Sequence, residues 1–208
     1  MKVLIITYYW PPAGGSGVQR WLKFVKYLQG FNIQPIVYTI SNPRYLTIDD
    51  SLLNEIPENI EVLKHPIWEP ADLLFWKKNL QQNSGISNAS KSSFLSFIRG
   101  NFFIPDPKLF WIKPSVKYLQ RYLNKNDVDV IISTGPPHSM HLIAEKLHQK
   151  NDVKWLADFR DPWSDIYYNK DFKEFSFVKN RNKKLEKSVL KKADCVLTVS
   201  NALKKEFS

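Results

Sequence analysis

A glycine-rich segment near the start of the chain has the residue types needed to bind an anion. Gly14-Gly15-Ser16-Gly17 holds three of the seven glycines within four positions. Glycine lets backbone N–H groups approach an anion closely, and the N-terminus of a following helix adds about half a positive charge. The segment therefore indicates phosphate binding, and a tight strand-to-helix turn without a ligand is the alternative.

The residues around this segment argue against the two common nucleotide-cofactor motifs. A dinucleotide-binding loop needs a third glycine, where this chain has Arg20, and an acidic residue after the second strand. That strand is expected to end between Thr39 and Asn42, and none of these residues is acidic. No Gly-Lys-Ser/Thr sequence occurs, so the chain also lacks the P-loop motif.

A second candidate segment, Ser133 to His138, comes at the carboxyl end of an apolar run. Ligands of open α/β sheets collect at that edge of the sheet. His138 and His141 are one helical turn apart, but no third metal ligand with fitting spacing accompanies them. His138 is therefore interpreted as a polar contact to substrate or, alternatively, as a solvent-facing residue at the start of a helix.

In the third candidate segment a guanidinium lies between two carboxylates. Asp158, Arg160 and Asp161 fall within four positions directly after another apolar run. Arg160 stays protonated and cannot act as a general base, whereas Asp161 could accept a hydrogen bond from a hydroxyl. The segment is either a structural ion-pair turn or a site for sugar hydroxyls and phosphate charge.

The elements that must position these segments alternate between strand and helix. Apolar runs rich in β-branched residues predict strands, and apolar residues at helical spacing, with Gly30 as a C-terminal stop, predict the helices between them. The sequence predicts an α/β, Rossmann-like, doubly wound and mostly parallel sheet. The expected strands are 3–8, 33–40, 128–133, 153–157 and 195–199, and the expected helices are 18–28, 115–123, 139–149, 174–192 and 201–207.

The alternation is interrupted by an irregular aromatic insertion at about 66–114. Its polar centre, 79–93, is expected to be a mobile loop. The flanking aromatic residues either fill a small satellite core or contact a membrane: Phe94, Phe97, Phe102, Phe103, Phe110 and Trp111. The helix expected at 174–192 is strongly basic, which is typical of a solvated face or of a face that binds anionic lipid.

Composition limits the classes of protein to which the chain can belong. It has 208 residues and a formal net charge of +10, which favours polyanionic partners. The single cysteine, Cys195, excludes a disulfide framework and a cysteine-based zinc site. The apolar run after Lys2 is too short for a signal peptide and leads into Pro11-Pro12. We therefore expect a cytoplasmic protein, and we expect any contact with the inner membrane face to be peripheral.

Four stretches in this order resemble the N-terminal domain of family 4 glycosyltransferases of the GT-B fold, of the type that builds bacterial surface polysaccharides. The stretches are PPAGGSGVQR, STGPPHSMHLIA, WLADFRDPW and LEKSVLKKADCVLTVS. The resemblance implies that residues 1–208 are one acceptor-side, Rossmann-like domain. It also implies a C-terminal nucleotide-sugar domain with a Glu-x7-Glu motif, which has no counterpart in this chain.

The resemblance implies retaining transfer of a sugar from a nucleotide diphosphate sugar to a carbohydrate or lipid-linked acceptor. It assigns Gly14 to Gly17 to the donor phosphates. It assigns a catalytic role to Arg160 and Asp161, where many relatives have a His-Asp pair. Arg20, His138 and Asp158 are expected to bind acceptor or substrate. No catalytic metal, cofactor or nucleic acid is expected.

Two interpretations from other classes stay open at this point. The chain could be a nucleotide- or anion-binding regulatory module without chemistry, which would bind nucleotide by itself. It could also be a peripheral membrane interaction domain that uses its basic helix and aromatic residues. As a glycosyltransferase half, by contrast, the isolated chain should be inactive and bind nucleotide sugars weakly.

Overall fold

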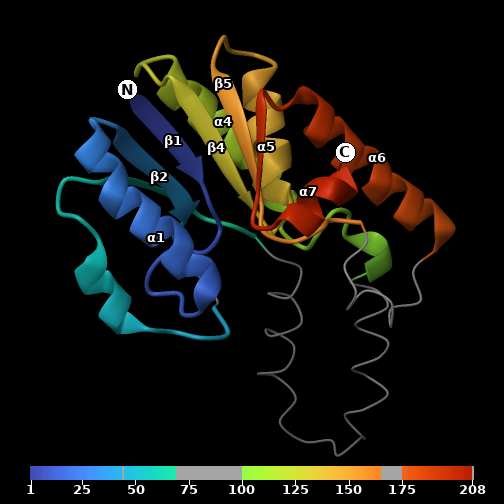
Figure 1. The fold of residues 1–208 in the computed structure, drawn as a ribbon, viewed down its shortest axis with the longest axis horizontal. Helices are drawn as coiled ribbons and strands as arrows, with labels where there is room; N and C mark the ends of the chain where they lie inside the picture. Colours follow the sequence, from blue (N-terminus) through green and yellow to red (C-terminus); the bar gives the residue numbers. More distant parts are fainter. Residues whose placement is uncertain (44, 69–99, 165–174, 208) are drawn as a thin grey trace, which may run out of the picture.

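Six parallel strands form a single sheet, in the order β3-β2-β1-β4-β5-β6 (Figure 1). The computed structural model describes residues 1–43, 45–68, 100–164 and 175–207. All strand pairs are parallel, which confirms the predicted doubly wound, Rossmann-like class. The strands are β1 (Lys2–Ile6), β2 (Gln34–Ile40), β3 (Glu61–His65), β4 (Val130–Gly135), β5 (Lys154–Phe159) and β6 (Cys195–Thr198).

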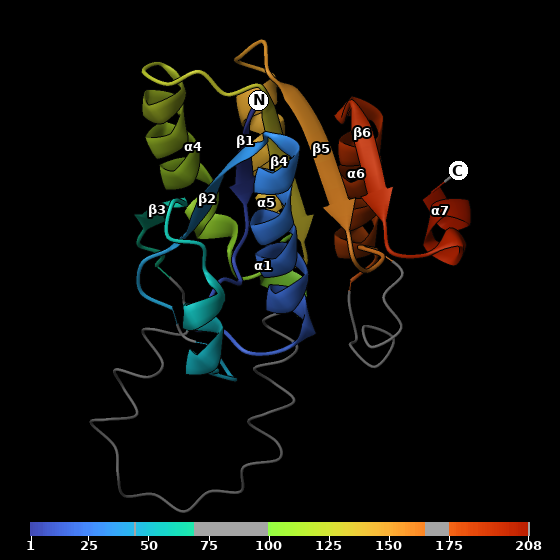
Figure 2. The same cartoon turned by 60° about the vertical axis from the view of Figure 1, so that its left-hand side comes forward.

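Helices cover both faces of the sheet, as Figures 1 and 2 show. On one face, α1 packs through Val18, Trp21, Leu22 and Val25. On the other face lie the helices that follow β3, β4 and β5. The helices are α1 (Ser16–Leu28), α4 (Leu109–Leu123), α5 (Ser139–His148), α6 (Ser176–Lys192) and α7 (Asn201–Phe207), with short 3-10 helices η1 (Gln29–Phe31) and η2 (Asp50–Glu55).

The central strand β1 illustrates why a continuous apolar run specifies this architecture. Val3 and Ile5 join the core under α1, whereas Leu4 and Ile6 join the core under α4 and α5. Successive side chains of a strand point to opposite faces. A strand covered by helices on both faces therefore needs apolar residues at every position.

Several element boundaries differ from those expected. Helix α4 begins at Leu109, well before Ser115, and includes Pro114, so the irregular insertion ends earlier than expected. The left-handed residue after α1 is Asn32, with φ 58°, and Gly30 lies inside η1. Strand β5 extends through Asp158 and Phe159, which places Asp158 in the sheet instead of the loop after it.

The aromatic residues near the end of the insertion differ in how deeply they are buried. Trp111 is buried in the core, stacked on Tyr38 with ring centroids 5.0 Å apart, so membrane contact by Trp111 was a wrong expectation. Phe102 is 68% exposed and Phe110 is 42% exposed. The expected mobile loop at 79–93, and with it Phe94 and Phe97, lies outside the described residues.

In the described ranges, no helix is both long and apolar enough to cross a membrane.

Candidate functional site

The three candidate segments meet at the carboxyl edge of the sheet. Between β1 and β4 the strand order changes direction, which makes this the topological switch point where open α/β sheets bind ligands. The glycine segment follows β1, Pro136 to His138 follow β4, and Arg160 follows β5. The three segments therefore lie at one edge of the sheet.

The glycine segment is fixed at its first residue and open at its second. The Gly14 N–H donates to the Thr47 carbonyl at 2.9 Å, and Ala13 forms a bridge with Ile48. Gly15 is the N-cap of α1, with φ 97° and no side-chain cap. Only glycine adopts such a conformation readily, and a Cβ at Gly15 would meet no atom within 4 Å. The backbone is thus exposed just before the first turn of α1.

Gly17 allows a guanidinium to lie against the first turn of α1. A Cβ at position 17 would collide with Nη1 of Arg160. The N-terminal end of a helix carries a partial positive charge, and Arg160 adds a full one. Two sources of positive charge therefore meet beside the glycine segment.

Arg160 is held in this position by backbone carbonyls of the loop after β4. Its Nε donates to the Gly135 carbonyl at 3.1 Å, and its Nη2 donates to the Pro136 carbonyl. Burial lowers the pKa of Arg160, while Asp158 and Asp161 act in the opposite direction. The side chain stays a cation, because arginine is not deprotonated in proteins. Partly withdrawn from water, this charge interacts strongly with a nearby anion.

Asp158 binds groups of the protein itself. Its side chain is fully buried, and its carboxylate accepts hydrogen bonds from Arg20 Nη2 at 3.0 Å, Trp21 Nε1 at 2.7 Å and Thr134 Oγ1 at 2.9 Å. These contacts join α1 to β4 and β5. They orient Arg20, whose side chain is 27% exposed, toward this edge of the sheet. Substrate contact by Asp158 and Arg20 stays a prediction.

His138 is buried beside Arg160. It is 5% exposed and stacks on Trp163, with ring centroids 4.7 Å apart and an interplanar angle of 4°. The solvent-facing alternative was therefore wrong. Burial and the neighbouring Arg160 lower the pKa of His138 to about 3, so the ring is neutral at physiological pH. Within the described residues, neither ring nitrogen has a hydrogen-bond partner.

A second histidine, His141, is hydrogen-bonded to Ser133. Trp155 Nε1 donates to Ser133 Oγ at 2.9 Å, and Ser133 Oγ in turn lies 2.8 Å from His141 Nδ1. Burial lowers the pKa of His141 well below its usual range. The ring is therefore neutral, and its buried Nε2 has no hydrogen-bond partner among the described residues.

Sequence reasoning missed the packing role of several residues at this edge. Gly135 is needed because a Cβ there would lie 2.5 Å from His141 Nε2. The hydrogen bonds that Trp21 and Thr134 donate to Asp158 were not predicted either. The sequence did offer a signal for the close contact at Gly135, namely a glycine at the end of a strand, just before a helix that begins with histidines.

Over the described part of the chain, no three His, Cys, Asp or Glu side chains are grouped to hold a metal ion.

Comparison with known proteins gives a likeness of fold. No protein-family model matches the chain, and a search of curated proteins finds no match. Among solved structures, sucrose-phosphate synthase from Thermosynechococcus elongatus aligns over 98% of this chain with a TM-score of 0.59 and 11% identity. The chain spans 43% of the length of that protein. UGT2 of Phytolacca americana aligns over 77% of this chain and 30% of its own, at a TM-score of 0.41 and 12% identity.

Proposed function

We propose that this chain is the acceptor-side half of a GT-B glycosyltransferase, which transfers a sugar from a nucleotide diphosphate sugar to a carbohydrate or lipid-linked acceptor with retention of configuration. The observation that carries the proposal is the contact between the glycine segment at the start of α1 and the Arg160 guanidinium. Both lie at the switch point of a fold that resembles one part of sucrose-phosphate synthase. The four sequence stretches in family order support the same assignment.

The site suits the charge that develops during sugar transfer. As the glycosidic bond to the diphosphate breaks, negative charge grows on the departing phosphate oxygen. The backbone N–H groups at Gly15 to Gly17 and the guanidinium of Arg160 would stabilise that charge without rearrangement. Because Arg160 is already held by the carbonyls of Gly135 and Pro136, it needs no ordering when substrate binds.

His138 would contribute hydrogen bonding rather than charge. Its low pKa keeps the ring neutral, so one ring nitrogen donates and the other accepts. That combination suits a sugar hydroxyl, which both donates and accepts, once movement of neighbouring side chains exposes a ring nitrogen that is buried in this structure. Asp161, whose charge acts on Arg160, would help to keep the guanidinium oriented or accept a hydrogen bond from a donor-sugar hydroxyl.

The proposal implies a division of labour that calorimetry can test. Nucleotide sugars should bind the isolated chain weakly and bind much more tightly when a nucleotide-sugar domain is present. In that complete enzyme, Arg160→Gln should reduce turnover, whereas Arg181→Gln, an exposed arginine on α6, should not. Micromolar binding of uridine or guanosine diphosphate sugars to the isolated chain would favour the regulatory-module alternative.

A membrane-facing role is supported by the start of α6. Phe175 and Phe177 are 46% and 63% exposed and stack with ring centroids 5.7 Å apart. Exposed basic residues follow along the same helix, including Lys183, Lys184 and Lys187. Apolar rings beside a basic face are typical of helices that lie on anionic membranes.

We therefore propose that this surface approaches the membrane when the acceptor is lipid-linked. Flotation with vesicles of graded anionic-lipid content should show binding that rises with anionic lipid and falls with salt. Changing Lys183, Lys184 and Lys187 to Glu should weaken it. Absence of binding to strongly anionic vesicles at low salt would leave α6 as a solvated helix.

A further inference from the structure

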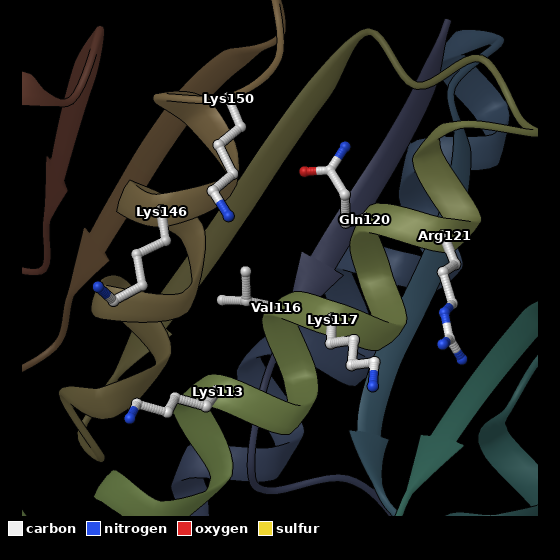
Figure 3. Close-up of a pocket in the computed structure, with 7 residues that line it drawn as sticks. All are labelled: Lys113, Val116, Lys117, Gln120, Arg121, Lys146 and Lys150. Atoms are coloured by element: carbon white, nitrogen blue, oxygen red, sulfur yellow. The ribbon is translucent and has the colours of Figure 1, made fainter.

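A basic groove runs between α4 and α5, on the face of the sheet opposite α1. Its volume is about 460 Å³, within the range of sites that hold small molecules. The groove is lined by five cationic side chains together with Val116 and Gln120 (Figure 3). The five cations are Lys113, Lys117, Arg121, Lys146 and Lys150.

Both walls of the groove carry cations. Lys113 extends from α4 toward Lys146 of α5, and Lys150 points into the gap beside Val116 (Figure 3). The side chains of Lys117 and Arg121 extend from the side of α4 that faces away from α5 (Figure 3). Val116 is buried and supplies an apolar floor.

Among the described residues, no ion pair is found to the cations of this groove. Elsewhere, Lys154 contacts Asp194 at 3.0 Å and Lys192 contacts Glu145 at 2.6 Å. Helix α4 contains no Asp or Glu. The one acid of α5, Glu145, accepts from Ser188 and Lys192 of α6 instead. The positive charge of the groove is therefore left for a ligand to neutralise.

A side-chain amide pair fixes one end of the groove. Gln120 Nε2 donates to Asn151 Oδ1 at 2.7 Å, and Asn151 Nδ2 donates back to Gln120 Oε1 at 3.1 Å. Asn151 also donates to the Leu147 carbonyl. The pair joins α4 to the turn after α5, next to Lys150. The separation of the two walls is thus set before any ligand arrives, which lowers the entropy lost on binding.

We propose that this groove is a binding site for a small ligand with two or more clustered phosphate groups. Several cations around a small concave volume match a compact polyanion, and an apolar floor fits the uncharged part of such a molecule. The site is separate from the candidate site at the sheet edge, since Lys146 lies about 12 Å along α5 from His138 by helix geometry. The proposal therefore does not depend on glycosyl transfer.

Calorimetry with inorganic tripolyphosphate at physiological salt is the direct test. The wild-type chain should bind it, and Lys113→Glu with Lys150→Glu, one change from each wall, should weaken binding by about tenfold or more. The matched control is Lys26→Glu with Lys64→Glu, which changes the net charge equally at exposed positions on α1 and β3. This control should bind nearly as the wild type does.

A second arm distinguishes a soluble ligand from a lipid headgroup. Vesicles containing phosphatidylinositol 4,5-bisphosphate, whose headgroup carries clustered phosphates, should be bound less by the groove variant than by the control variant if the phosphates belong to a lipid. They should be bound equally by both variants if the ligand is soluble. Groove-dependent binding in either arm supports the site. Binding in neither arm, equal losses in the two variants, or groove-dependent binding of a DNA duplex alone would overturn the proposal.

Discussion

The guanidinium of Arg160 lies directly against Gly17, so closely that the position beside it has no room for a Cβ. Residues 17 and 160 belong to different strand-helix units, and the contact brings the start of α1 together with the segment after β5. Arg160 also reaches two carbonyls of the loop after β4. One side chain thereby connects all three candidate segments.

Gly17→Ala should displace Arg160 while leaving the fold intact. Alanine favours the helix by about 1 kcal/mol, which offsets part of the cost of moving the guanidinium, so the melting temperature should change little. Turnover of the complete enzyme should fall about a hundredfold, the scale for loss of one charge-stabilising donor. Gly30→Ala, at an exposed glycine with no atom within 4 Å of its added Cβ, is the control. Equal activity of the two variants would remove the contact from the mechanism.

Gly15→Ala should destabilise the chain through the backbone alone. A Cβ at Gly15 meets no neighbour, yet φ is 97°, a conformation that costs other residues about 1–3 kcal/mol. Denaturant unfolding should show this loss for Gly15→Ala and no comparable loss for Gly30→Ala. A crystal structure of the Gly15→Ala variant with φ unchanged and full stability would contradict the argument.

Asp158→Asn tests whether the buried carboxylate holds α1 on the sheet. Three donors converge on this fully buried side chain. Breaking a fully buried pair costs about 3–5 kcal/mol. The cost here should be smaller, since Arg20 is 27% exposed. The control is Glu55→Gln, which breaks the surface pair between Glu55 and Lys23, also on α1. Exposed pairs of this kind contribute little to stability. Similar unfolding free energies for both variants would show that Asp158 is dispensable.

The central strands could be predicted from the sequence because both of their faces are covered. β1, β2 and β4 are almost wholly buried, and a continuous apolar run is the direct result. The edge strand β3, Glu61–His65, is only partly buried and includes charged residues. Its pairing with β2 is a tertiary effect that leaves no apolar run to recognise.

The candidate site was predictable as an edge of the sheet but not as a set of contacts. Parallel strands place their carboxyl ends together, so the three segments could be expected to meet. The burial of His138 depends on its stacking against Trp163. This contact could not be predicted from the presence of a histidine and a tryptophan in the sequence.

The last prediction concerns acid stability and the buried His138. Its pKa is about 3 in the folded chain and about 6.5 in an unfolded one. Between these values the unfolded state binds a proton that the folded state does not, so stability rises with pH. From pH 8 to pH 5, this one histidine should cost the folded state about 2 kcal/mol.

His138→Phe keeps an aromatic ring against Trp163 and removes the proton-binding nitrogens. At pH 8 the histidine is neutral in both the folded and the unfolded state, so the difference in unfolding free energy between variant and wild type reflects only the change in packing. The pH 8 difference is therefore the reference for the difference at pH 5. Between pH 8 and pH 5 the wild type should lose about 2 kcal/mol more than the variant, measured by urea unfolding at both pH values. Nuclear magnetic resonance of the folded wild type should also show no titration of the His138 ring near pH 6.5. A ring that titrates there, with parallel pH profiles for both proteins, would mean that His138 is hydrated and cannot be the neutral hydroxyl ligand proposed for the site.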